Sequence, residues 1–140
     1  MYANNSLRDR FTDDGLTTAS GPRIVVMCYE RLDRDLAEAI VAIESNDTNR
    51  SHLLLCHAQD IVHELLCMLD TEAWEHARSL ASIYRYVTEL LTQANVGKRV
   101  GPAIEAQQLL AELGSAFRQA SVGLAQTDQQ RPTTMISVRA

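Results

Sequence analysis

The sequence predicts an all-α protein, an antiparallel up-down four-helix bundle with an irregular N-terminal arm and a disordered C-terminal tail. Apolar residues recur at intervals of three and four along four stretches, which is typical of amphipathic helices. Polar turns separate these stretches, and only six Gly and three Pro in 140 residues leave little room for a turn-rich β architecture. Four such helices with short connections favour an up-down bundle.

We expect one domain over residues 1–125, with an arm over 1–20 and a flexible tail over 126–140. The expected helices cover about 22–45, 49–69, 73–95 and 101–124. Asp47 is a candidate cap for the second helix. In the first expected helix, the face opposite the apolar positions is charged and solvated, and it includes Asp35. In the fourth expected helix, Ile104 belongs to the apolar stripe that faces inward. The tail has no periodicity and is interrupted by Pro132.

The stretch 57–70 lies at the centre of the second expected helix and carries two apolar stripes. The first stripe consists of Ala58, Ile61, Leu65 and Met68, and the second of Val62, Leu66 and Leu69. Together they form a face wider than one neighbouring helix would cover. The helix must therefore be covered by several partners, either from its own chain or from another.

Composition excludes several classes of protein. The net charge of −5 argues against a nucleic-acid binder, and no apolar run approaches the ~18 residues of a membrane span. The first twenty residues have no apolar core of a secretory signal. Three cysteines, an odd number in helical pattern, fit reduced thiols. We expect a cytoplasmic protein.

No constellation of residues predicts catalysis. A di-iron site needs Glu-x-x-His motifs on two helices, and Asp60-Ile-Val-His63 is a single partial match. The pairs His52/Cys56 and His63/Cys67 each share a helix face and could hold zinc. Cysteine more commonly acts as a small buried hydrophobe, and only Cys28 and His76 remain to complete four ligands. We therefore expect no metal, no cofactor and no enzymatic activity, and keep a metal- or redox-responsive bundle as an alternative.

Four segments together resemble the flagellar secretion chaperone FliS family, which holds flagellin before export. They are Thr18-Ala-Ser20 with Tyr29-Glu30, Ala58–Ile61 with Glu64-Leu65 and Leu69-Asp70, Leu80–Val87 with Leu90–Asn95, and Leu109–Ala120. The order and spacing of these segments carry the resemblance. The chain departs from the family pattern in having Phe11 where a tyrosine is usual, and in lacking a Gly-Gly pair before the third helix.

The resemblance implies a protein that binds the disordered C-terminal segment of flagellin in apolar grooves and so prevents flagellin from polymerising prematurely. It further implies that the protein is a monomer when no client is bound. It also implies docking on the flagellar export apparatus as a further contact, and neither nucleic-acid binding nor membrane insertion. The expected partner-binding residues are Phe11, Tyr29, Val62, Leu66, Leu69, Tyr84, Tyr86, Val87, Leu91, Ala94 and Asn95. We expect Ile61 and Leu65 to face the core instead. The alternative is a generic helical-bundle adaptor for another helical or disordered protein partner.

Phe11 gives the sharpest single hypothesis. We expect its ring to dock reversibly over the groove as a plug, whereas the alternative is an apolar residue in a loosely ordered arm. Deleting residues 1–16 separates the two, because unchanged peptide affinity and unchanged solubility without client would contradict the plug.

Overall fold

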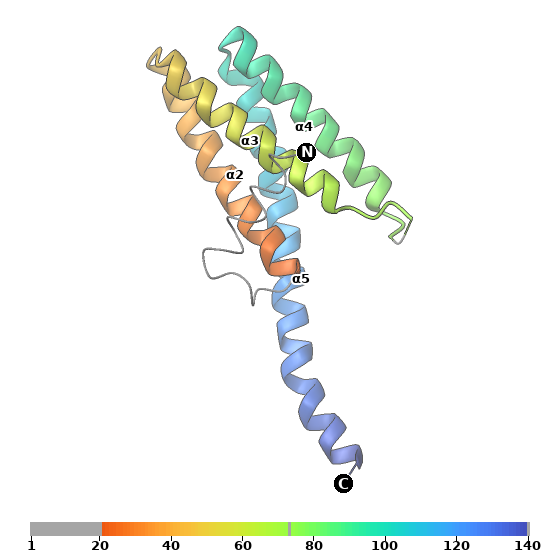
Figure 1. The fold of residues 1–140 in the computed structure, drawn as a ribbon. Coiled ribbons are helices and arrows are strands. Elements are labelled where there is room, and N and C mark those ends of the chain that lie inside the picture. Colours follow the sequence, from red (N-terminus) through yellow and green to blue (C-terminus); the bar gives the residue numbers. More distant parts are fainter. Residues whose placement is uncertain (1–20, 73, 140) are drawn as a thin grey trace.

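The structure of the protein, a computed structural model, describes residues 21–139 apart from Ala73, and the side chains of residues 21–120 within that range. This part contains four helices: α2 Gly21–Glu44, α3 Thr48–Met68, α4 Ala77–Gly97 and α5 Val100–Arg139. They form an antiparallel bundle in which each helix packs on its neighbour in the chain and α5 closes the ring against α2 (Figure 1). The predicted all-α four-helix bundle is therefore confirmed.

Two tight turns set the register of the bundle. Between α2 and α3, Asn46 adopts the left-handed conformation with φ 59°, and the Asp47 side chain accepts a 3.1 Å hydrogen bond from the Arg50 backbone N–H. This is the helix cap expected from the sequence. After α4, Lys98 has φ 50° and its backbone N–H donates to the carbonyl of Ala94. Both turns reverse the chain within a few residues, which places consecutive helices antiparallel.

The expected start of the third helix at residue 73 is wrong, since α4 begins at Ala77. The Asp70 carboxylate accepts a 3.0 Å hydrogen bond from the Glu72 backbone N–H, so a local turn forms here in place of the first turn of a helix. The Trp74 carbonyl then accepts from the Ala77 backbone N–H at 3.1 Å, which closes the connection at the start of α4. The loop between α3 and α4 is consequently longer than expected.

The expected end of the fourth helix near residue 124 is also wrong, because α5 continues to Arg139 and extends beyond the other helices (Figure 1). Residues 124–131 are mostly good helix formers, and lengthening an existing helix requires no new nucleation. A proline inside a helix costs about 3 kcal/mol, and Pro132 does not end this one. The side chains of this extension, like the arm over 1–20 with Phe11, lie outside the described residues.

The core runs along the full length of the four-helix part. Its buried apolar side chains are Cys28, Tyr29, Leu32, Leu36, Ala39, Ala42, Ile43, Leu55, Ala58, Ile61, Val62, Leu65, Ala77, Leu80, Ala81, Tyr84, Val87, Leu90, Leu91, Ala94, Ala103, Ala106 and Leu110. Most of these were expected from the apolar spacing. Ile104 is an exception, because it is 38% exposed while Ala103 and Ala106 face inward. These two alanines, with their small side chains, occupy the inward positions where the sequence analysis placed Ile104.

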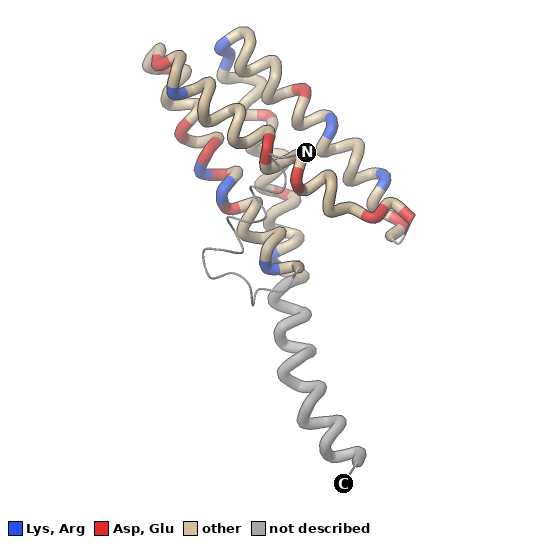
Figure 2. Tube along the Cα trace, viewed as in Figure 1, with Lys and Arg blue, Asp and Glu red and all other residues tan. Residues whose placement is uncertain are grey.

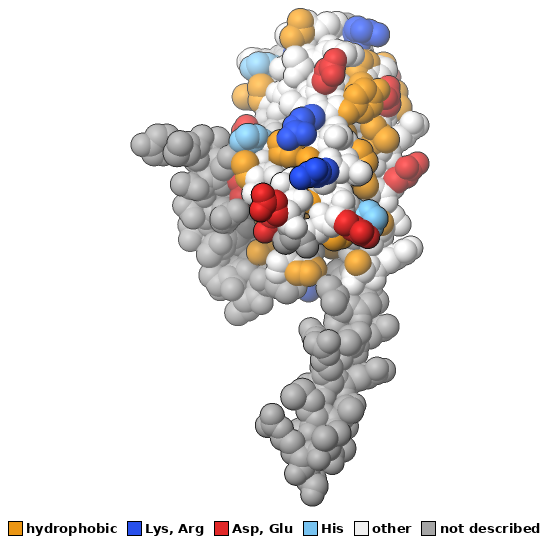
Figure 3. All heavy atoms as spheres, turned by 90° about the vertical axis from the view of Figure 1, so that its right-hand side faces the viewer, with side chains coloured by type: hydrophobic (Ala, Val, Ile, Leu, Met, Phe, Trp, Pro, Cys, Tyr) orange, Lys and Arg blue, Asp and Glu red, His pale blue; other side chains and the backbone are white. Residues whose placement is uncertain are grey.

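Most of the charged residues whose side chains are described are exposed, and acidic and basic residues are interspersed along α2 (Figure 2). Figure 3 views the side on which α4 lies, where hydrophobic side chains separate the charged groups. Asp35 differs from the other charged residues of α2, because it is only 2% exposed although the sequence placed it on the solvated face. In the described part of the chain, no helix is long and apolar enough to cross a membrane.

Candidate functional site

The structure divides the expected partner-binding residues into core and surface. Tyr29, Val62, Tyr84, Val87, Leu91 and Ala94 are buried. Leu66, Leu69 and Asn95 are half-buried, and Tyr86 is 45% exposed. The assignment of Ile61 and Leu65 to the core agrees with their burial.

Val62 is the clearest departure from the expected groove. It was placed beside Leu66 and Leu69 on a client-facing stripe, yet its exposure is 0%. The stripe on α3 is wide because α2 and α4 both pack against this helix, so its apolar positions are shared between two neighbours. In this arrangement of helices a partner reaches only the outer members of the stripe.

Tyr29 and Tyr84 meet each other in the core. They come from α2 and α4, at opposite corners of the bundle, and their hydroxyl oxygens are 2.6 Å apart. The Tyr29 ring also stacks on Phe117 of α5 with 5.5 Å between ring centroids. A Cβ atom at Gly114 would lie 3.3 Å from the Tyr29 Cβ, so the glycine makes room for this ring. The two tyrosines therefore join α2, α4 and α5 inside the bundle.

Burial keeps these tyrosines and the neighbouring thiol protonated. Burial raises the pKa of Tyr84 to about 12, although its hydrogen bond with Tyr29 acts in the opposite direction. Burial is also the main cause that raises the pKa of Tyr29, followed by the charge of Tyr84. Burial and then the Glu64 carboxylate raise the pKa of Cys28 to about 12. A thiol held in this form is a poor nucleophile, so Cys28 acts as a packing residue.

A buried carboxylate links α2 to α3. The Asp35 carboxylate accepts from the Arg31 guanidinium at 3.2 Å and from the His57 ring nitrogen Nδ1. Both partners are more exposed than Asp35, so the charge of the carboxylate is compensated at the edge of the core. This arrangement explains why an aspartate occupies an inward position of α2, and it assigns His57 a structural role.

A groove opens between α2 and α5. It has a volume of about 460 Å³. Its lining residues are Tyr29, Glu30, Asp33, Arg34, Leu36, Gln107, Leu110, Ala111, Gly114 and Arg118. The buried members of this set are apolar or glycine, whereas the charged members are exposed. The α2–α5 groove therefore combines an apolar floor with a rim that carries both signs of charge, and it suits one side of an amphipathic segment.

Other apolar side chains remain accessible around α4. Tyr86 is exposed on α4, and its hydroxyl donates to the Glu105 carboxylate of α5. That hydrogen bond is the main cause that raises the pKa of Tyr86. Trp74, in the loop before α4, is 44% exposed. Leu66 and Leu69, half-buried at the end of α3, pack against the edge of the core. These side chains offer apolar contact area outside the α2–α5 groove.

Comparison with known proteins places this bundle in a family. The chain matches the family described as Flagellar protein FliS over residues 3–123, which is most of its length. The chain belongs to the FliS family. It is also 27% identical over 110 residues to the Flagellar secretion chaperone FliS of Bacillus subtilis (strain 168), an alignment that covers 79% of this chain and 82% of that protein. The family suggested by the four sequence segments is therefore confirmed.

Two features of this FliS-family chain were not predicted from its sequence. The α2–α5 groove depends on small residues, Ala111 and Gly114, which stand where a larger side chain would fill the seam. Their spacing of three residues on one helix was the available signal. The Asp35–His57 pair had no signal in the sequence, since its residues are 22 apart.

Proposed function

We propose that this protein is a cytoplasmic export chaperone that binds the disordered C-terminal segment of flagellin. Binding covers the apolar side chains of that segment, so that flagellin neither polymerises prematurely nor loses its competence for secretion. In this proposal the protein is a monomer without its client, carries out no catalysis, and presents the loaded client to the flagellar export apparatus.

Family membership over residues 3–123 is the observation that carries this proposal. The matching relative from Bacillus subtilis is named a flagellar secretion chaperone. The chemistry of the bundle agrees with a binding function, because its buried tyrosines and Cys28 are held protonated and Asp35 is compensated by Arg31 and His57.

The surface offers two places for a wrapped client. The α2–α5 groove, at about 460 Å³, has room for a few side chains rather than a whole segment. The exposed Tyr86 and the half-buried Leu66 and Leu69 lie outside it and extend the apolar surface. A disordered segment loses conformational entropy when it binds, and a large apolar contact area is needed to offset that cost. We therefore assign the client to the groove and these outer residues together.

Calorimetric titration of the full chain with the C-terminal segment of the cognate flagellin tests the proposal. We expect saturable binding with a large negative heat-capacity change, because apolar surface is buried. A peptide of the same composition in scrambled order serves as the ligand control. Absence of binding to the flagellin segment would exclude the chaperone function, and equal binding of the scrambled peptide would favour the generic adaptor.

Two alanines on α5 provide a matched pair of variants. Ala111 lines the groove, whereas Ala116 is equally exposed on the same helix and does not line it. Ala111→Trp should fill the groove and weaken flagellin binding by about tenfold or more, which corresponds to ~1.4 kcal/mol. Ala116→Trp should leave affinity unchanged. If both variants bind as the unaltered chain does, the client does not use the groove.

A further inference from the structure

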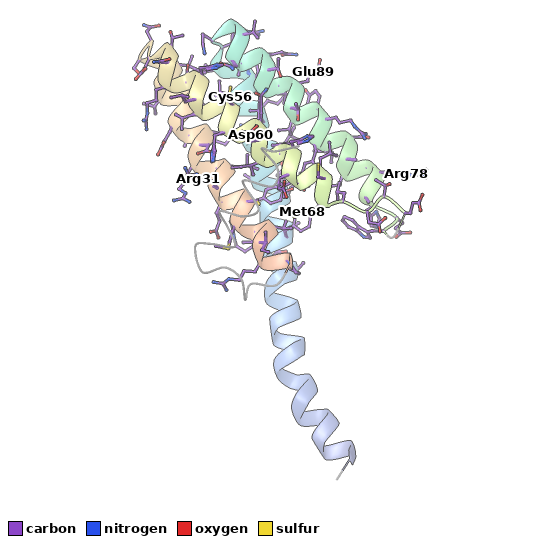
Figure 4. The ribbon with its side chains drawn as sticks, viewed as in Figure 1. Arg31, Cys56, Asp60, Met68, Arg78 and Glu89 are labelled. Carbon is purple, nitrogen blue, oxygen red and sulfur yellow. The ribbon has the colours of Figure 1, made fainter. Side chains whose placement is uncertain are left out.

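The outer face of α3 carries the same pair of residue types twice. His52 and Cys56 are four residues apart, and His63 and Cys67 repeat this spacing eleven positions later. At 100° per residue all four side chains fall within a sector of about 60°. His52, His63 and Cys67 are exposed and Cys56 is half-buried, so the sector faces away from the core. Cys56 and Asp60 can be followed along α3 in Figure 4.

The ligand atoms within each pair are already close together. His52 Nε2 lies 3.6 Å from Cys56 Sγ, and His63 Nε2 lies 3.7 Å from Cys67 Sγ. Zinc bonds of about 2.3 Å to sulfur and about 2.05 Å to nitrogen, at the tetrahedral angle, place those two atoms about 3.6 Å apart. Each pair therefore has the spacing of two ligands of one tetrahedral zinc ion.

The Asn95 amide orients the ring of the first pair. His52 Nδ1 lies 3.0 Å from Asn95 Nδ2 and 3.3 Å from Asn95 Oδ1, and Cys56 Sγ lies 3.8 Å from Nδ1 and 3.6 Å from Nε2. Asn95 Oδ1 also accepts a 2.7 Å hydrogen bond from Lys98 Nζ, which holds the Asn95 side chain beside His52. A zinc-bound imidazole commonly donates its other N–H to a carbonyl or carboxylate oxygen, and Asn95 Oδ1 is near enough to accept it.

The described part of the chain does not complete either site by itself. Among the described residues, no three His, Cys, Asp or Glu side chains gather around one point that could hold a metal. Cys28 and His76 are the two other candidate ligands in the sequence. Cys28 is buried in the core, and His76 lies beyond the end of α3. A second copy of the chain offers the two further ligands that each pair needs.

We propose that zinc joins two copies of this chain through antiparallel α3 helices, with two His and two Cys ligands at each of two sites. When α3 of the second copy runs in the opposite direction, a two-fold axis near Gln59 and Asp60 brings His52/Cys56 of each copy opposite His63/Cys67 of the other. The two sites are about 16 Å apart along the helix. Each zinc displaces the thiol protons of two cysteines, and these protons pass to the solvent.

Charge favours a metal-bridged pair over direct association. Each copy has a net charge of −5, so two copies repel one another when no metal is present. Zinc supplies the positive charge and the directed bonds that hold them together. The metal-free protein remains the monomer of the proposed function.

Titration of the full chain with zinc alone, in a phosphine reductant, tests this proposal by sedimentation and metal analysis. We expect one zinc per chain, a doubling of mass, and reversal by a chelator. Substituting cobalt should produce a thiolate charge-transfer band that Cys56→Ser combined with Cys67→Ser abolishes. His76→Ala, outside both pairs, should change nothing. Monomeric mass at saturating zinc, or equal uptake by the double cysteine variant, would overturn the proposal.

Mixing two variants tests the antiparallel arrangement. One variant carries His52→Ala and Cys56→Ala, and the other carries His63→Ala and Cys67→Ala. Neither should form a dimer alone, because like pairs are far apart across the two-fold axis. An equimolar mixture should form a heterodimer with one zinc, since each chain supplies the pair that the other lacks. Zinc-dependent dimers of a single variant would overturn the antiparallel arrangement, and a monomeric mixture would overturn the bridge itself.

Discussion

Two of the four seams of the bundle, α3–α4 and α2–α5, differ in what they leave accessible. Between α3 and α4, Val62, Val87 and Leu91 are fully buried, and the cavity of about 360 Å³ at the Thr48 end of this seam is lined mostly by polar residues. Between α2 and α5, the small residues Ala111 and Gly114 leave a groove of about 460 Å³. The seam with the stronger apolar pattern is therefore the closed one. A wide apolar stripe predicts burial, whereas small residues along a seam predict a groove.

Leu91→Ala should have the largest effect on the closed seam. Removing a fully buried leucine side chain lowers the free energy of unfolding by about 2–5 kcal/mol, because transfer and cavity terms add. Urea titration followed by circular dichroism measures this loss, and Val96→Ala, on an exposed position of the same helix, should change little. If Leu91→Ala lowered flagellin affinity without lowering stability, the α3–α4 seam would be the client groove instead.

Tyr84→Phe, in the core between α2 and α4, should have a smaller effect on stability. The change leaves the buried Tyr29 hydroxyl without its partner at 2.6 Å, and an unsatisfied buried group costs about 1–3 kcal/mol. Tyr86→Phe is the matched control, because the Tyr86 hydroxyl reaches only an exposed carboxylate. Equal denaturation midpoints for the two variants would show that the buried hydroxyl pair contributes nothing to stability.

Raising the pH into the alkaline range should have the smallest of these effects on the free energy of unfolding. Cys28 and Tyr84 have pKa values raised from 9.0 and 10.0 to about 12 in the folded chain. Between pH 9 and 12 the unfolded chain has therefore released protons that the folded chain still holds. The free energy of unfolding should be unaffected by these groups below pH 9 and fall as the pH rises toward 12. Urea titrations across this range should give a shallower decline for Tyr84→Phe, and an identical decline would contradict the raised pKa of Tyr84.

The fold could be predicted from the sequence because apolar spacing fixes which face of each helix is buried. Ile61 and Leu65 were assigned to the core in this way and are buried there. The same spacing does not reveal which element covers a stripe, and this is why Val62 was assigned to a groove. Asp35 shows a second limit, since its burial depends on His57 from another helix. Contacts between residues far apart in the sequence decided both cases.

Cross-linking from the α2–α5 groove tests the central claim most directly. A photoreactive phenylalanine analogue is incorporated at Ala111 in the groove or, as a control, at Asp60 on the outer face of α3. The complex with full-length flagellin is then irradiated, and the linked peptides are identified by mass spectrometry. We predict links from position 111 to the C-terminal segment of flagellin and none from position 60. Links from position 60 alone, or links from position 111 to other parts of flagellin only, would contradict the account.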